Sequence, residues 1–139
     1  MKIIIIDGQG GKMGKMLVEN LKKELPGYAL IALGTNSIAT ASMLKAGADF
    51  GATGENPVVF NCHDADIIVG PIGIVVANSL MGEITPPMAL AVGQSRAQKI
   101  LIPVAKCNNT VVGVKDLPLG EYIHLAVRQV KEFIGNQET

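Results

Sequence analysis

The residues best suited to chemistry lie near the start of the chain, in the run Gly8-Gln9-Gly10-Gly11-Lys12-Met13-Gly14. An apolar run at residues 2–7, typical of a buried strand, comes directly before it. Directly after it, apolar residues recur every fourth position, the spacing of one helix face: Met13, Leu17, Leu21 and Leu25. A strand, a glycine turn and a helix in this order can bind a phosphate, because the turn lets the backbone approach and the helix amino end presents unpaired N–H groups. The alternative is a glycine turn that serves only close packing of helix on sheet.

Two kinds of phosphate loop have to be distinguished. In a P-loop the pattern is G-x-x-x-x-G-K-[ST], and aligning its G-K on Gly14-Lys15 puts Gln9 and Met16 at the first glycine and the hydroxyl position. Both diagnostic positions fail, so the sequence disfavours ATPase or GTPase chemistry. The dinucleotide loop fits better, and the stretch resembles the amino-terminal loop of dihydrodipicolinate reductases, G-x-x-G-[RK]-M-G. Asp7 departs from that resemblance, since a carboxylate beside a pyrophosphate is unfavourable. It either caps the N–H groups of the loop or has a functional role.

Length and composition limit the classes of protein. A chain of 139 residues predicts one domain, residues 1–139, with no room for a separate catalytic domain. Lys plus Arg number 12, as do Asp plus Glu, so we expect neither nucleic acid nor an acidic membrane surface as a partner. Two cysteines without metal-ligand spacing predict no metal site and a cytoplasmic location. The apolar stretch 67–93 is divided by Gly and Pro into pieces too short to span a bilayer.

Strands and helices are expected to alternate. The predicted strands are residues 2–7, 28–33, 49–53, 66–70 and 100–104, and the predicted helices are residues 12–25, 37–46, 57–65, 72–81, 86–95 and 119–134. Val58-Val59-Phe60 also looks like a strand, but it is too close to 66–70 for a parallel crossover. Residues 110–114 are expected to form an antiparallel hairpin partner or an edge strand. The pattern predicts an α/β fold with a doubly wound, mainly parallel, Rossmann-like sheet in the order 3-2-1-4-5.

This topology predicts where a ligand binds. In doubly wound sheets ligands lie outside the carboxyl ends of the strands, where the strand order reverses. Three glycine-rich strand ends are expected to meet there and to form the cofactor site: Gly8 to Gly14, then Gly34, Thr35, Asn36 and Ser37, and finally Gly70, Pro71, Ile72 and Gly73. No acid stands at residues 34–37, where NAD-binding folds place the carboxylate that binds the ribose. The sequence therefore does not support specificity for NAD, and the cofactor expected is NADP or NAD, with a mononucleotide left open.

Catalytic candidates are few. A nucleophile could be sought in the run Asn61-Cys62-His63-Asp64. Consecutive helix residues point about 100° apart, however, so Cys62 is expected in the core and His63 and Asp64 on the solvated face. His124 lies in the last predicted helix. Cys107 in a predicted loop is the better reactive thiol. Glu83 is either a solvent-facing turn residue or a site residue near Gly70–Gly73.

Nearly the whole chain resembles a family of small bacterial proteins catalogued only as a domain of unknown function. The resemblance rests on five segments: residues 5–11, 32–36, 45–49, 51–56 and 66–73, with Ala77-Asn78 beyond. It implies no activity.

Two functions of different class remain. The first is a module that binds a small-molecule nucleotide, NADP(H) or a related one. The second is a small NAD(P)-dependent reductase or transferase whose site is completed by a partner subunit. A purely structural protein is a third reading. Because a reductase with this loop needs a substrate domain that the chain has no room for, the sequence favours binding. The charge-poor region 72–92 further predicts a homodimer.

Overall fold

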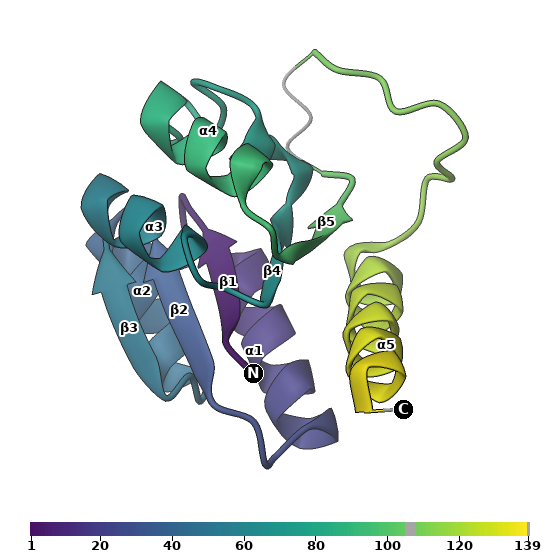
Figure 1. Ribbon diagram of the computed structural model, residues 1–139. Helices are drawn as coiled ribbons and strands as arrows, with labels where there is room; N and C mark the ends of the chain where they lie inside the picture. Colours follow the sequence, from purple (N-terminus) through teal and green to yellow (C-terminus); the bar gives the residue numbers. More distant parts are fainter. Residues whose placement is uncertain (105–107, 139) are drawn as a thin grey trace.

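The computed structural model describes residues 1–104 and 108–138 (Figure 1). Its strands are β1 (Ile3–Asp7), β2 (Leu30–Gly34), β3 (Phe50–Thr53), β4 (Ile67–Pro71) and β5 (Gln98–Ile102). Its helices are α1 (Lys12–Glu24), α2 (Ser37–Lys45), α3 (Glu55–Cys62), α4 (Pro86–Gln94) and α5 (Leu119–Glu138), with a short 3-10 helix, η1 (Ile72–Val75), directly after β4.

All five strands form one parallel sheet in the order β3-β2-β1-β4-β5. β1 lies at its centre and pairs with both β2 and β4, so that Ile4, for example, faces Ile31 on one side and Ile68 on the other. The predicted doubly wound, Rossmann-like fold is therefore confirmed. The strand order reverses between β1 and β4, which places the switch point of the fold beside the glycine loop.

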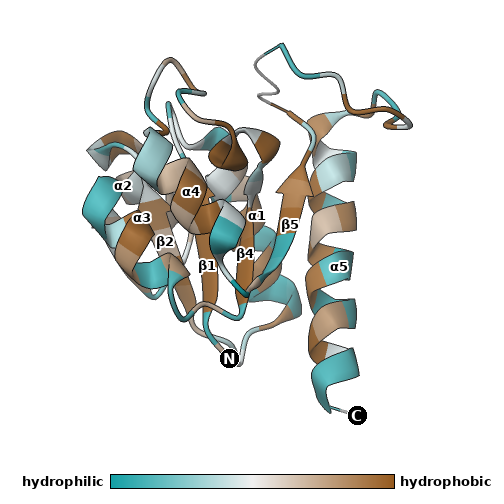
Figure 2. Cartoon of the chain, turned by 45° about the horizontal axis from the view of Figure 1, so that its top comes forward, coloured by the Kyte–Doolittle hydropathy of each residue, from teal (hydrophilic) through white to brown (hydrophobic). Residues whose placement is uncertain are grey.

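Two hydrophobic cores cover the two faces of the sheet. The first contains Ile3 and Ile5 of β1 together with the apolar faces of α1, α2 and α5. The second contains Ile4 and Ile6 together with α3, α4 and the segment after η1. Successive strand residues point to opposite faces, so the four isoleucines of β1 are all fully buried. Figure 2 shows apolar strands at the centre and α5 lying along β5.

Helix starts follow the expected chemistry in two places. Asn36 caps α2 by accepting a hydrogen bond from the Ala39 N–H at 2.9 Å, and Thr85 caps α4 by accepting one from the Met88 N–H at 3.3 Å. Pro86 follows as the first residue of α4, where its missing N–H costs nothing. The starts of α2 and α4 are therefore each held by a capping side chain.

Several local predictions are wrong. The 72–81 helix is only the 3-10 turn η1, after which the chain runs as turns to Ile84. Helix α3 begins at Glu55 after Gly54 rather than at Pro57, and residues 110–114 form no strand.

The apolar region 72–92 mostly buries its own side chains against the sheet. Leu80, Ile84, Met88 and Val92 belong to the second core, and the large apolar residues left exposed there are Met81 and Leu90. Within the described residues no helix has both the length and the hydropathy to cross a bilayer. The homodimer stays a prediction.

Candidate functional site

The glycine loop forms a tight turn at the carboxyl end of β1. The Gly11 N–H donates to the Gly8 carbonyl at 2.9 Å, and Gln9 and Gly11 have φ angles of 51° and 75°. Gly11 is the N-cap of α1 and offers no capping side chain. Within the described residues, the N–H groups of Gly10, Lys12 and Met13 have no hydrogen-bond acceptor. The loop thus presents unpaired donors and the positive end of the helix dipole to the same space.

Asp7 holds the loop from inside the protein. Its side chain is 6% exposed, and its Oδ2 accepts a hydrogen bond from the Gly14 N–H at 2.7 Å. It therefore supplies the bond that an N-cap side chain supplies in other helices. Of the two roles that the sequence leaves open for Asp7, the structure shows the capping one.

Glu83 holds the same loop from outside. Its Oε1 accepts hydrogen bonds from the Thr35 hydroxyl at 2.5 Å, the Gln9 N–H at 2.8 Å and the Asn36 side-chain amide at 2.9 Å. Three donors from the ends of β1 and β2 thus converge on one carboxylate oxygen. Glu83 therefore contacts the first two glycine-rich strand ends and not the Gly70–Gly73 turn.

The two carboxyls differ in acidity. Burial raises the pKa of Asp7 above its ordinary value, against the hydrogen bonds from the Gly14 and Gly8 backbone, and the nearby Glu83 charge raises it further. Burial also raises the pKa of Glu83, but the hydrogen bonds from Thr35, Gln9 and Asn36 outweigh that and hold it below its ordinary value. Glu83 is consequently the more firmly ionised of the two.

An irregular segment, residues 76–85, carries Glu83 to the loop. Asn78, Leu80 and Met81 have φ angles of 65°, 55° and 59°, a left-handed conformation that is uncommon outside glycine. The segment is closed by hydrogen bonds from the Asn78 N–H to the Ile84 carbonyl at 2.7 Å and from the Ile84 N–H to the Ser79 carbonyl at 3.2 Å. These two hydrogen bonds hold the backbone from which the Glu83 side chain reaches the glycine loop.

A pocket of about 350 Å³ opens at the switch point. Its lining combines the loop with apolar side chains from across the crevice: Asp7, Gly8, Gln9, Gly10, Gly11, Lys12, Met13, Pro71, Leu80, Val104 and Leu119. The volume is at the low end of the range for small-molecule sites, roughly 300–1,000 Å³. Only a compact ligand fits between the loop and the apolar wall.

The structure brings the predicted site residues together only in part. Gly8 to Met13 and Pro71 line the pocket, whereas Gly14 is packed beneath Met43 and Asp7. Thr35 and Asn36 are joined to the loop through Glu83, while Ser37 is exposed at the start of α2 and Gly34 packs against Thr40. Gly70 packs on the Ile6 backbone, and Ile72 lines a separate apolar groove with β5 and α5. Gly73 is buried, and its carbonyl accepts a hydrogen bond from Ser79.

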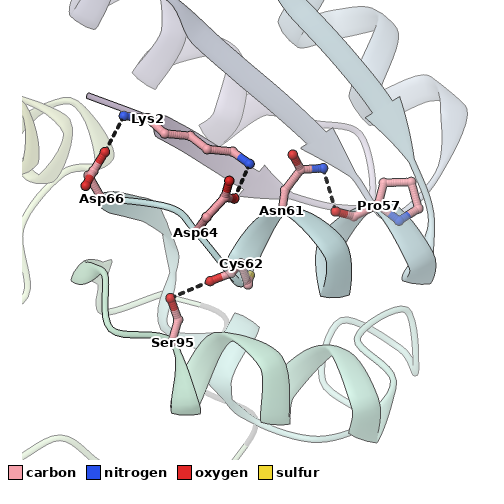
Figure 3. Close-up of polar contacts among 7 residues, drawn as sticks. All are labelled: Lys2, Pro57, Asn61, Cys62, Asp64, Asp66 and Ser95. Atoms are coloured by element: carbon pink, nitrogen blue, oxygen red, sulfur yellow. Dashed lines mark hydrogen bonds and ion pairs between the residues drawn. The ribbon is translucent and has the colours of Figure 1, made fainter.

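The Asn61–Asp64 sequence has structural partners at the opposite end of the sheet (Figure 3). The Cys62 carbonyl accepts a hydrogen bond from Ser95 at 2.7 Å, and Asp64 pairs with the Lys2 ammonium at 2.5 Å. Cys62 is 1% exposed, and burial raises the pKa of its thiol to about 11. Its predicted core role is confirmed, and His63 and Asp64 are exposed as expected.

The other candidates lie apart from the pocket. His124 is exposed on α5, in a polar groove between α1 and α5. Cys107 lies outside the described residues. In the described part of the chain, no cluster of three His, Cys, Asp or Glu side chains could hold a metal ion.

Fold and pocket together define a doubly wound α/β protein with a small site at its switch point. The chain belongs to the family described as Domain of unknown function (DUF3842), whose sequence profile matches residues 2–135. A search of curated proteins gives no match. Among solved structures the chain is similar to a dodecameric FMN-dependent UbiX-like decarboxylase from Escherichia coli O157:H7, with 14% identity and a TM-score of 0.47. The match covers 97% of this chain and 94% of that one.

The prediction of an NADP- or NAD-binding module is wrong, and the reductase alternative falls with it. The solved structure named above is described as FMN-dependent and not as dependent on NAD or NADP. The site gives a physical reason: the Gln9 N–H, part of the loop that would bind a pyrophosphate, is already bonded to Glu83. A 2′-phosphate at Thr35 and Asn36 would meet the same carboxylate. The family match does not show the resemblance of the loop to dihydrodipicolinate reductases.

Proposed function

We propose that the protein binds a compact organic phosphate, a phosphomonoester, in the pocket at the β1–β4 switch point. The observation that carries the proposal is the pocket of about 350 Å³ that the glycine loop lines at the start of α1. The phosphate would accept hydrogen bonds from the N–H groups of Gly10, Lys12 and Met13. The Lys12 side chain, which is exposed and lines the pocket, adds a positive charge.

The opposite wall supports an organic body on the phosphate. Met13, Pro71, Leu80, Val104 and Leu119 line that wall. Apolar walls with a few placed polar groups are typical of small-molecule sites. The ligand class is therefore a phosphomonoester with a small, largely apolar remainder.

Gly10 offers a clean way to test the proposal. A Cβ added there would have nothing within 4 Å and Gly10 has no positive φ, so Gly10→Val fills the pocket mouth without strain. Gly11→Val is a poor test, because its Cβ would lie 2.8 Å from the Ala39 Cα and Gly11 has a φ of +75°. Gly27→Val is the matched control, since Gly27 is equally open and does not line the pocket.

The experiment is an NMR titration of backbone amides with sugar phosphates and FMN, preceded by mass spectrometry of compounds extracted from the purified protein. We expect saturable shifts at Gly10, Lys12 and Met13 in the natural protein and in Gly27→Val, and their loss in Gly10→Val. If a folded Gly10→Val variant binds as well as the natural protein, the proposal is wrong. The proposal is also wrong if none of the phosphomonoesters gives saturable shifts in the natural protein.

A further inference from the structure

We infer that Glu83 is a specificity-determining residue: it is a built-in anion that excludes a second phosphate from the glycine loop, so the site takes monophosphates and rejects diphosphates. This inference rests on the proposed function, because it concerns which phosphates the same loop accepts. It starts from the three donors that converge on the Glu83 Oε1.

The Gln9 N–H, the Thr35 hydroxyl and the Asn36 amide together form a site for an anion. They come from two strand ends, and their donor–acceptor distances to the one oxygen are 2.8, 2.5 and 2.9 Å. Short bonds from several donors to one charged acceptor are among the strong hydrogen bonds of proteins. The second phosphate of a diphosphate bound at the loop would need this place, and Glu83 already holds it.

The surroundings keep Glu83 there. Gly8 lies beneath it so closely that an added Cβ would be 2.9 Å from the Glu83 Oε1 and 3.0 Å from the Leu80 Cδ1. Asn36 also donates to the Gln9 carbonyl at 2.9 Å, which fixes the amide that faces Glu83. Leu80 is buried and lines the pocket, so the segment that carries Glu83 also forms the wall on that side.

Electrostatics then divides the crevice into two parts. On the α1 side the unpaired N–H groups and Lys12 favour an anion, and on the β2 side the carboxylate repels one. Placing like charges side by side costs several kcal/mol, and about 1.4 kcal/mol corresponds to a tenfold change in affinity. We therefore expect Glu83 to lower the affinity for a diphosphate, relative to a monophosphate, by about tenfold or more.

Glu83→Gln is the decisive variant. Its amide oxygen can still accept the bonds from Gln9, Thr35 and Asn36, so the crevice keeps its shape while the charge is removed. Glu83→Ala removes both charge and acceptor. Glu19→Gln, an exposed position on α1 away from the pocket, controls for the change in net charge.

Inorganic phosphate and inorganic pyrophosphate serve as probes, and the affinities come from the amide shifts of Gly10, Lys12 and Met13. We expect the ratio of pyrophosphate to phosphate affinity to rise about tenfold or more in Glu83→Gln and in Glu83→Ala, and not in Glu19→Gln. If the natural protein binds phosphate but this ratio is unchanged in both Glu83 variants, the inference is wrong and the proposed function stands. If phosphate binds none of the proteins, both fail.

Discussion

Two carboxylates bond the glycine loop, and they differ in burial and in acidity. Asp7 directly precedes the loop, is buried and bonds Gly14, and its pKa is raised mainly by burial. Glu83 lies 74 residues beyond Gln9 in sequence and is half-buried, and hydrogen bonds lower its pKa. The same chemical group is thus a buried acceptor for the start of α1 in one place, and in the other a more firmly ionised acceptor for donors at the ends of β1 and β2.

The largest expected effect of this difference is on stability. Asp7→Ala leaves the buried Gly14 N–H without an acceptor, which costs about 1–3 kcal/mol of unfolding free energy. Glu83→Ala leaves donors that are closer to solvent, so its cost is about 1 kcal/mol or less. Urea unfolding of both variants measures the difference. If Glu83→Ala lowers the unfolding free energy as much as Asp7→Ala does, the expected difference between the two carboxyls is wrong.

A second prediction concerns the pH dependence of stability, which should have opposite signs for the two groups. The folded pKa of Asp7 lies above its ordinary 3.8, so the folded chain binds the proton more tightly and the stability contribution falls as the pH rises from 3.8 through the folded value. The folded pKa of Glu83 lies below its ordinary 4.5, so its contribution is present above 4.5 and is lost as the pH falls through the folded value.

These signs can be tested by measuring the unfolding free energy of the natural protein, of Asp7→Asn and of Glu83→Gln across the acid pH range. The stability of the natural protein relative to Asp7→Asn should fall with rising pH, and that relative to Glu83→Gln should rise. Slopes of the same sign for the two variants would contradict the assignment.

A smaller effect is expected from the donors of Glu83. Thr35→Val keeps the shape of the side chain and removes the hydroxyl that lies 2.5 Å from the Glu83 Oε1. The pKa of Glu83 should rise, and the unfolding free energy should fall by about 0.5–1.5 kcal/mol. A carboxyl-carbon NMR titration measures the pKa. An unchanged value would mean that Thr35 does not stabilise the charge.

The smallest predicted effect links the two carboxyls directly. The negative charge of Glu83 contributes to the raised pKa of Asp7. Glu83→Gln should therefore lower the pKa of Asp7 slightly while leaving its bond to Gly14 intact. The same NMR titration detects this shift, and a rise in the pKa would refute the coupling.

The fold could be predicted because the residues that end strands and begin helices can be recognised within short stretches of this sequence. Gly47 and Gly54 bound a short strand, and the length needed for a parallel crossover decides that β3 is Phe50–Thr53 rather than residues 58–60. Asn36 and Thr85 mark helix starts that the structure confirms. Each of these signals involves neighbours within a few residues.

The rest was not predictable because it depends on contacts between distant residues. Composition suggested a helix at 72–81, yet Asn78 and the left-handed run Leu80–Gly82 turn the chain instead. Nothing in the local sequence indicates which glycine-rich turn a lone acid contacts, so Glu83 could be named as a candidate but not placed. Through its bonds with Thr35 and Asn36, Glu83 places a carboxylate where the local sequence contains no acid.

The three hydrogen bonds that Glu83 accepts also bear on the order in which the chain folds. Its three bonds span 74, 48 and 47 residues, whereas the β1-α1-β2 unit that contains the loop is local in sequence. Contacts between residues far apart in sequence form late, because closing the long intervening loop costs chain entropy first. During synthesis, we therefore expect the glycine loop to emerge with an open Gln9 N–H, which Glu83 can bond only once the segment after β4 has left the ribosome and folded back.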